Sequence, residues 1–248
     1  MTAARVHVAR DHEAASRAAA EEFVRQIADR SRNATTFVAL SGGSTPKRMY
    51  QMLAGDEFRP MVTWGQVHFF WSDERPVPPT DPDSNYRMAS EALLQPLGIA
   101  PGQIHRMRGE DLDLPAAARA YEEEMARAFG VQWKSHPPRF DLVLLGLGAD
   151  GHTASLFPRT VALQERRHWV VANPVPQLRT TRLTMTYPVL NAARCVLFLV
   201  TGRDKAEAVA RVFSPTGAVE EVPARGVCPH DGELVWFLDE AAARRLDG

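Results

Sequence analysis

The sequence has few cysteines, because Cys195 and Cys228 are the only two in a chain of 248 residues. Two cysteines do not make a disulfide framework, so we expect a reducing compartment and a cytoplasmic protein. Cys195 stands inside the apolar run CVLFLV and has no evident base nearby in the sequence. This context predicts a small buried side chain and argues against a nucleophilic thiol.

Long hydrophobic runs and an excess of one charge are also missing. No apolar stretch approaches the roughly 18–20 residues needed to span a bilayer. The N-terminal stretch MTAARVHVARDHEAA lacks the apolar core of a signal peptide. Lys and Arg together number 29 against 30 Asp and Glu, which leaves a net charge of −1. This balance argues against a dedicated nucleic-acid or membrane-surface protein, although a basic pocket can still lie within it.

Metal-binding and serine-hydrolase motifs are absent as well. Nothing resembles GxSxG, and the histidines outside the DGH motif discussed below show neither HxxxH nor HxH spacing. The sequence therefore predicts no metal site. These scattered histidines are His7, His12, His68, His105, His136, His168 and His230.

The chain does contain a regular alternation of strands and helices. Several of the strands are apolar throughout, which predicts a mainly parallel, twisted sheet covered by helices on both faces. No shift in composition divides the chain, so we expect one Rossmann-like α/β domain over residues 1–248. The expected strands are 5–8, 36–40, 67–70, 140–148, 168–172, 181–186, 195–201 and 233–239, and the expected helices are 11–30, one starting near 46, 84–94, 115–129, 203–213 and 240–246.

A first polar, glycine-rich segment, SGGSTPK, follows the strand 36–40 and precedes a helix. Ligands of open α/β sheets bind outside the carboxyl ends of the strands. The free N–H groups of a helix N-terminus favour an anion such as phosphate, so Gly42, Gly43, Ser44 and Thr45 are candidate phosphate-binding residues. The alternative is a tight turn with a helix cap, and the spacing is not that of a Walker A loop.

Charged side chains follow other strands. Asp73 and Arg75 stand in WSDER directly after a buried strand, where Arg75 can hold a phosphate or carboxylate through two hydrogen bonds. A salt bridge at the strand end is the alternative reading. Arg179 and Arg182 in RTTRLT and Lys205 in TGRDK are surface charges unless they converge on the glycine-rich loop.

The segment GLGADGHTASLFP contains the spelling GxGxxG, which is typical of dinucleotide binding. That motif requires its last glycine to open a helix, but Pro158 leaves room for two helical turns at most. Gly151 instead permits a turn that aims Asp150 and His152 into one cleft. There the imidazole can take a proton from water and the carboxylate can orient it. A histidine that caps the next turn is the alternative.

Taken in order, five segments resemble the 6-phosphogluconolactonase family, whose nearest relatives are the glucosamine-6-phosphate isomerases and deaminases. They are LSGGSTP, WSDERPVPPTDPDSNYRMA, DLVLLGLGADGHTASLFP, RLTMTYPVLNAAR and VTGRDKAEAV, and the likeness runs from about residue 10 to 243. The resemblance implies hydrolysis of 6-phospho-D-glucono-1,5-lactone to 6-phospho-D-gluconate in the oxidative pentose phosphate pathway. It also implies no metal or organic cofactor and a small-molecule sugar-phosphate partner. We expect a monomer or a small homo-oligomer.

The resemblance also assigns roles to individual residues. His152 matches the general base on the attacking water, and Asp150 would support it. The loop formed by Gly42, Gly43, Ser44 and Thr45 matches the sugar-phosphate loop, Arg75, Arg182 and Lys205 match basic residues near phosphate or lactone, and Asp73 and Asn85 lie in matching motifs.

The sequence leaves two alternatives to the lactonase open. A sugar-phosphate isomerase or deaminase of this family continues after DGH with a segment resembling IAFNEP, whose glutamate takes part in ring opening. This chain reads TASLFP there and has no carboxylate before Glu165, which favours the lactonase. A non-catalytic sugar-phosphate-binding protein is the other alternative, but such a protein does not need the intact pair of Asp150 and His152.

Overall fold

A six-stranded sheet forms the centre of the computed structural model, which describes residues 4–246. Its strand order is β1–β9–β8–β5–β2–β3, and every pairing in it is parallel. The predicted mainly parallel α/β fold is therefore confirmed, while the single domain over residues 1–248 stays a prediction. The strands are β1 (Arg5–Ala9), β2 (Thr36–Leu40), β3 (Val67–Trp71), β5 (Leu142–Leu145), β8 (Cys195–Val200) and β9 (Glu233–Asp239).

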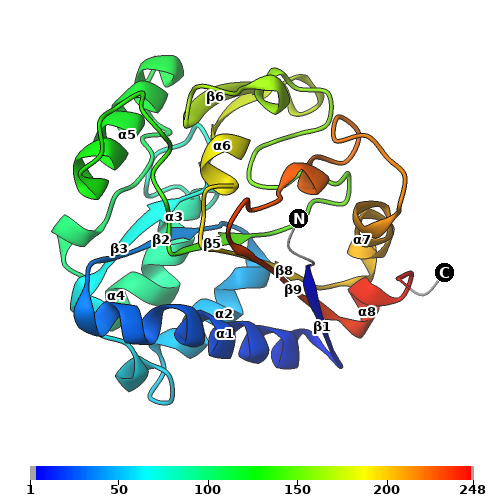
Figure 1. Ribbon diagram of the computed structural model, residues 1–248, viewed down its shortest axis with the longest axis horizontal. Coiled ribbons are helices and arrows are strands. Elements are labelled where there is room, and N and C mark those ends of the chain that lie inside the picture. Colours follow the sequence, from blue (N-terminus) through cyan, green and yellow to red (C-terminus); the bar gives the residue numbers. More distant parts are fainter. Residues whose placement is uncertain (1–3, 247–248) are drawn as a thin grey trace.

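Helices cover both faces of this sheet, as the apolar strands predict. Alternate residues of β5 point to opposite faces: Leu142 and Leu144 pack in one buried cluster, and Val143 and Leu145 pack in another. The first cluster includes buried side chains of the helices α1 (His12–Asn33), α2 (Ser44–Ala54), α3 (Asn85–Ala89) and α4 (Gln95–Leu97). The second contains α5 (Leu114–Phe129), α6 (Tyr187–Leu190), α7 (Ala206–Phe213) and α8 (Glu240–Ala243). Figure 1 shows α1 and α2 below the sheet and α5 and α6 above it.

A second, three-stranded sheet differs from the expectation. The strands predicted over 168–172 and 181–186 do not join the parallel sheet; they form an antiparallel sheet of order β4–β7–β6. The physical reason is the short link between the last two, because a parallel pairing needs a crossover of a dozen or more residues. These strands are β4 (Asp73–Glu74), β6 (Val170–Val175) and β7 (Thr180–Met185).

Helix boundaries follow the capping residues that the sequence indicates. Asp11 caps α1 by accepting a hydrogen bond from the Ala14 N–H at 2.8 Å, and the Ser84 hydroxyl accepts from the Arg87 N–H at 3.2 Å. The helix expected over 84–94 begins as α3 and continues through a π-helical turn, Ser90–Leu94, into α4. Short 3₁₀ turns lie at Arg59–Met61, Trp64–Gln66, Pro101–Gln103, Val161–Gln164, Pro176–Leu178, Arg203–Lys205 and Pro223–Gly226.

The segment between Gly151 and Pro158, where the sequence leaves room for two helical turns at most, contains no helical turn. The residues after Gly151 form turns and an isolated bridge between Thr153 and Leu156, with no helix before Pro158. The loop therefore leaves β5 without the helix that a dinucleotide fingerprint requires.

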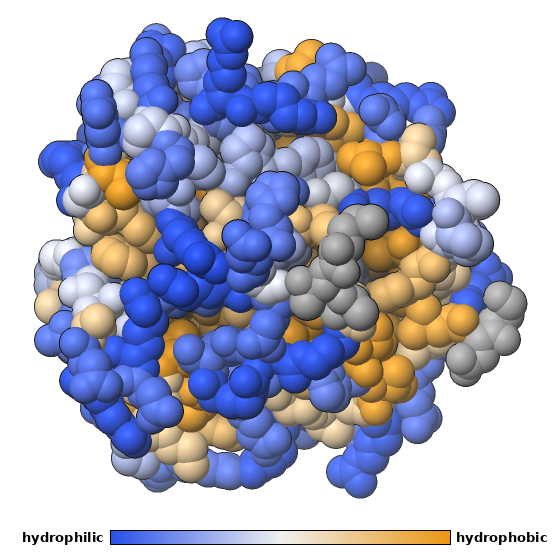
Figure 2. Space-filling view, in the orientation of Figure 1, coloured by the Kyte–Doolittle hydropathy of each residue, from blue (hydrophilic) through white to orange (hydrophobic). Residues whose placement is uncertain are grey.

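Within residues 4–246, the six exposed large apolar side chains lie on several different elements. Figure 2 shows hydrophilic side chains over most of the face seen in Figure 1, with smaller apolar patches between them. Among the helices that the structure describes, none is both long and apolar enough to cross a membrane. The exposed apolar residues are Val6, Val8, Met61, Leu112, Val161 and Leu178.

Candidate functional site

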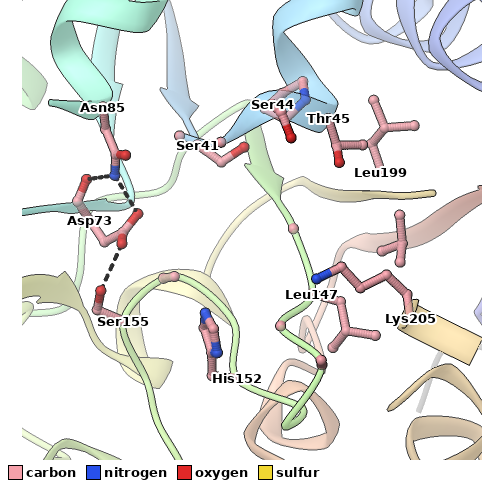
Figure 3. Close-up of a pocket in the computed structure, with 18 of the residues that line it drawn as sticks. Ser41, Ser44, Thr45, Asp73, Asn85, Leu147, His152, Ser155, Leu199 and Lys205 are labelled. Atoms are coloured by element: carbon pink, nitrogen blue, oxygen red, sulfur yellow. Dashed lines mark hydrogen bonds between the residues drawn. The ribbon is translucent and has the colours of Figure 1, made fainter. Parts of the chain in front are cut away.

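A cavity of about 800 Å³ lies where the carboxyl ends of β2, β5 and β8 meet. Parallel strands bring the loops that follow them to one edge of the sheet, which is where such folds bind ligands. All eleven residues to which the family resemblance assigns a role line this cavity, and Figure 3 labels several of them. They are Gly42, Gly43, Ser44, Thr45, Asp73, Arg75, Asn85, Asp150, His152, Arg182 and Lys205. Arg179 is not among the lining residues.

The loop after β5 turns sharply at Gly151, whose φ of 90° lies in the left-handed region. Two backbone hydrogen bonds close the turn. The Gly151 N–H donates to the Gly148 carbonyl at 2.9 Å, and the Gly148 N–H donates to the His152 carbonyl at 2.8 Å. Asp150 and His152 consequently both face the cavity, as the glycine between them predicts.

Gly148 has a different reason to be glycine. A Cβ atom there would lie 2.0 Å from the His152 Nδ1 and 2.7 Å from the Asp150 Oδ1, far inside contact distance. The second glycine of the GxGxxG spelling thus makes room for the imidazole, and the third provides the turn. Both requirements are local, and neither involves a pyrophosphate.

His152 is held by its neighbour Asp150. The Asp150 Oδ1 lies 2.6 Å from the His152 Nδ1 and accepts a second hydrogen bond from the His152 backbone N–H at 3.1 Å. Burial acts to raise the pKa of Asp150, but the hydrogen bond and charge of His152 outweigh it and hold that pKa below its ordinary value. An ionised carboxylate only accepts, so Nδ1 donates and the lone pair of the neutral ring lies on Nε2. The ring also stacks on Phe157, with centroids 4.0 Å apart.

Asp73 joins this loop to the second sheet. The Ser155 hydroxyl donates to the Asp73 Oδ2 at 2.7 Å, and the Asn85 side-chain amide donates to the Asp73 Oδ1 at 3.1 Å and to its carbonyl at 2.9 Å (Figure 3). A Cβ on Gly42 would lie 1.8 Å from the Asn85 Oδ1, so the phosphate-loop candidate packs directly on this network. Ser155 is a site residue that the sequence did not single out.

Asn85 is itself positioned by Glu74. The buried Glu74 carboxylate accepts hydrogen bonds from the Asn85 N–H at 2.8 Å and the Tyr86 N–H at 2.9 Å, at the first turn of α3. Burial raises the pKa of Glu74, although these N–H groups act to lower it. Its side chain therefore fixes α3 and with it the amide that reaches Asp73.

Arg75 and Arg182 lie beside each other at the cavity without a carboxylate partner. In the part of the chain that the structure describes, neither forms an ion pair; Arg75 donates to the Asn85 Oδ1 at 2.9 Å and to the Asp83 carbonyl at 2.5 Å. The expected alternative of a strand-end salt bridge is thus not found. The Arg182 Nε is buried without a hydrogen-bond partner, and burial followed by the charge of Arg75 lowers the pKa of Arg182. Two adjacent cations with an unpaired buried N–H are suited to an anionic oxygen.

A second group of donors lies at the start of α2. Its cap residue Gly43 has a φ of 100° and no side-chain capping bond, so the first N–H groups of the helix are left for a ligand. Lys205 lines the same cavity, and its Nζ lies 3.3 Å from the Asp204 Oδ2. In Figure 3, Ser44, Thr45 and Lys205 occupy the side of the cavity opposite Asp73, Asn85 and Ser155.

His12 and Thr201 also line the cavity, and their contribution was not foreseen. The His12 Nδ1 lies 2.9 Å from the Thr201 hydroxyl. The available signal was position, because each follows the carboxyl end of a strand in the parallel sheet. Among residues 4–246, no group of three or more His, Cys, Asp or Glu side chains is arranged to hold a metal ion.

Comparison with known proteins gives one consistent result. The model of the family described as glucosamine-6-phosphate isomerases/6-phosphogluconolactonase matches residues 10–236. The chain is 45% identical over 210 residues to a 6-phosphogluconolactonase of Synechocystis, covering 84% of each chain, and 36% identical over 245 residues to one of Streptomyces coelicolor, covering 96% of this chain and 93% of the other. The solved 6-phosphogluconolactonase of Trypanosoma cruzi superposes with a TM-score of 0.87 at 30% identity, covering 99% of this chain and 98% of the other.

Proposed function

The chain belongs to the glucosamine-6-phosphate isomerase/6-phosphogluconolactonase family, and we propose that it hydrolyses 6-phospho-D-glucono-1,5-lactone to 6-phospho-D-gluconate. One observation carries the proposal most strongly. An ionised Asp150 fixes the His152 ring by Nδ1 at 2.6 Å, which leaves Nε2 as a base in a cavity that also holds anion-binding groups.

His152 would start the reaction by taking a proton from water through Nε2. The water oxygen forms a bond to C1 of the lactone, and the carbonyl oxygen becomes an oxyanion. When the C1–O5 bond breaks, the imidazolium returns its proton to the leaving ring oxygen, and the products are a free hydroxyl and a carboxylic acid that ionises. A positioned base of this kind contributes about 10²–10⁴-fold. Asp150 keeps the ring oriented and stabilises the imidazolium while it exists.

The two groups of donors would bind different parts of the substrate. Arg75 and Arg182 would face the developing oxyanion, because they lie near Asp73 and the loop of His152 and lack carboxylate partners. The start of α2 together with Lys205 would hold the phosphate, which is remote from the reacting carbon. Binding energy gained there orients the lactone against the base.

A deaminase is the second candidate, because the family includes both activities. Phe157 is the residue that takes the place of the glutamate in the deaminase-like segment IAFNEP. It is 4% exposed and stacks on His152, so an apolar ring stands where a ring-opening enzyme of this kind has a carboxylate. This favours lactone hydrolysis.

Purified protein offered two substrates separates these candidates. Freshly prepared 6-phosphogluconolactone should release acid faster than its spontaneous hydrolysis, and glucosamine 6-phosphate should release no ammonia. Ammonia release without accelerated lactone hydrolysis would reverse the assignment. Failure with both substrates would favour a protein that only binds sugar phosphates.

A further inference from the structure

His12 occupies a defined place in the cavity that the mechanism above does not use. It is the first residue of α1, and its side chain lines the cavity together with that of Thr201, which directly follows β8. The Thr201 hydroxyl lies 2.9 Å from Nδ1, so one ring nitrogen is fixed by the protein. In the described part of the chain, Nε2 has no hydrogen-bond partner, and it remains for a ligand.

The start of α1 is tied to the start of α2. Arg48 on α2 donates two hydrogen bonds to Glu13 on α1, from Nε to Oε2 at 2.8 Å and from Nη2 to Oε1 at 2.6 Å. His12 is adjacent to Glu13, so the start of α1 is held against α2, and His12 lines the same cavity as Ser44 and Thr45 at the start of α2. Lys205 lies four residues after Thr201 and also lines this cavity, on the same side as Ser44 and Thr45 in Figure 3.

The acidic groups around His12 are already engaged. Asp11 caps Ala14 and lies 3.1 Å from the Arg10 Nε, and Glu13 is paired with Arg48. On the neighbouring segments, Asp204 lies 3.3 Å from the Lys205 Nζ, and Asp239 accepts hydrogen bonds from the Gly202 and Ala242 N–H groups. No carboxylate of the described chain therefore hydrogen-bonds to His12.

The groups that meet at this end of the cavity are mainly donors. They are the first N–H groups of α2, two hydroxyls, an ammonium and the second nitrogen of an imidazole. A ligand that satisfies them together must present several acceptor oxygens and negative charge, which is the chemistry of a phosphate monoester.

We propose that His12 donates a hydrogen bond through Nε2 to the phosphate of the substrate and so contributes to selection of phosphorylated over unphosphorylated lactones. The inference rests on the proposed function for the identity of the substrate. It differs from a structural role, in which the contact with Thr201 would be the only purpose of the side chain.

Three substitutions separate these roles. Glutamine at residue 12 can place its amide nitrogen near the position of Nε2, whereas asparagine can reach only the position of Nδ1. We therefore compare His12→Ala, His12→Gln and His12→Asn with His136→Gln, which changes an exposed histidine away from the cavity. The readout is kcat/KM for 6-phosphogluconolactone and for D-glucono-1,5-lactone, with thermal melting to verify folding.

We expect His12→Ala and His12→Asn to lower kcat/KM about tenfold for the phosphorylated lactone, the size of one lost hydrogen bond to a charged group. The unphosphorylated lactone should react at the wild-type rate, and His12→Gln and His136→Gln should stay near wild type with both. Equal losses with both lactones, no loss at all, or better retention by asparagine than by glutamine would overturn the proposal.

Binding measured without turnover separates this inference from the proposed function. Calorimetry gives the Kd of 6-phosphogluconate and of gluconate for wild type and for His12→Ala. Weaker binding of 6-phosphogluconate alone supports the role of His12 even if the wild type proves not to hydrolyse the lactone. Unchanged binding of both ligands contradicts that role even if the lactonase activity is present.

Discussion

Asp150 and His152 are separated by one glycine, and their side chains meet at 2.6 Å between Oδ1 and Nδ1. The left-handed turn at Gly151 makes this contact possible, because an extended chain would not fold both side chains onto one another over so short a span. The contact holds the Asp150 carboxylate against Nδ1 of the His152 ring and leaves Nε2 available in the cavity.

Replacement of Asp150 by asparagine tests the role of this carboxylate. The amide can still hydrogen-bond to the ring, but it no longer stabilises an imidazolium or imposes the Nδ1–H form. We expect kcat for lactone hydrolysis to fall by roughly 10²-fold, with a much smaller change in KM. Steady-state kinetics with a freshly prepared lactone measures both values, and an unchanged kcat would remove Asp150 from the mechanism.

Gly148 offers a second prediction because a methyl group there would collide with the His152 ring. Gly148→Ala should displace the imidazole and lower kcat by about 10²-fold, the cost of a misplacement of roughly 1 Å. Gly146→Ala is the matched control, since its Cβ would meet no atom within 4 Å. Circular dichroism should show both variants folded. Equal activity of the two would mean that the packing of Gly148 against His152 has no catalytic consequence.

Arg182 should show opposite effects on activity and stability. Arg182→Met removes a cation that lies beside Arg75 and has a buried, unpaired Nε, so the free energy of unfolding should stay level or rise. The same change should lower kcat/KM by about 10-fold or more, because a donor to an anionic oxygen is lost. Arg179→Met, on the nearby hairpin but outside the cavity lining, should leave kcat/KM unchanged. A destabilised Arg182→Met protein with full activity would exclude Arg182 as a donor to the substrate.

Protonation of His68 should make the folded protein less stable at low pH. Its Nδ1 lies 2.9 Å from the His105 Nε2, and burial followed by the charge of His105 lowers the pKa of His68 below 6.5. The unfolded chain then binds a proton more readily than the folded one in the window between the lowered pKa and 6.5, so the free energy of unfolding falls as pH drops through that window. Above pH 6.5, the protonation of His68 no longer affects the free energy of unfolding.

Urea unfolding at pH 7 and pH 5 measures this dependence. His68→Phe, which cannot take up a proton, should show a smaller loss of stability between the two pH values than the wild type. His136→Gln, at an exposed loop position, is the control and should behave like the wild type. A variant and a wild type with the same pH dependence would exclude His68 as the source.

Much of the fold could be predicted from local sequence patterns. The apolar runs TFVAL and CVLFLV are central strands, and Asp11 and Ser84 cap the helices they precede. Strand pairing is less accessible, because β4 has only two residues and pairs with a strand far along the chain. The three-stranded sheet that β4 forms with β7 and β6 was therefore not expected.

The candidate site was predicted where chemistry and chain position coincide. Asp150 and His152 are two residues apart, so their pairing requires only a local turn. Ser155 and Asp73 are far apart in sequence, and nothing in TASLFP indicates that its hydroxyl reaches a carboxylate after β3. No motif in the sequence marks His12 as a site residue, and the contact between Arg48 of α2 and the adjacent Glu13 joins segments far apart in the sequence.

In the proposed mechanism, His152 is the base that activates water for lactone hydrolysis. The most direct test follows acid release from fresh 6-phosphogluconolactone at constant pH with wild type and with His152→Gln, while calorimetry verifies that 6-phosphogluconate still binds. We predict acceleration over the spontaneous rate by the wild type, and a rate at least about 10²-fold lower in the variant with binding retained. A variant that binds the product and hydrolyses the lactone as fast as the wild type would show that His152 is not the base.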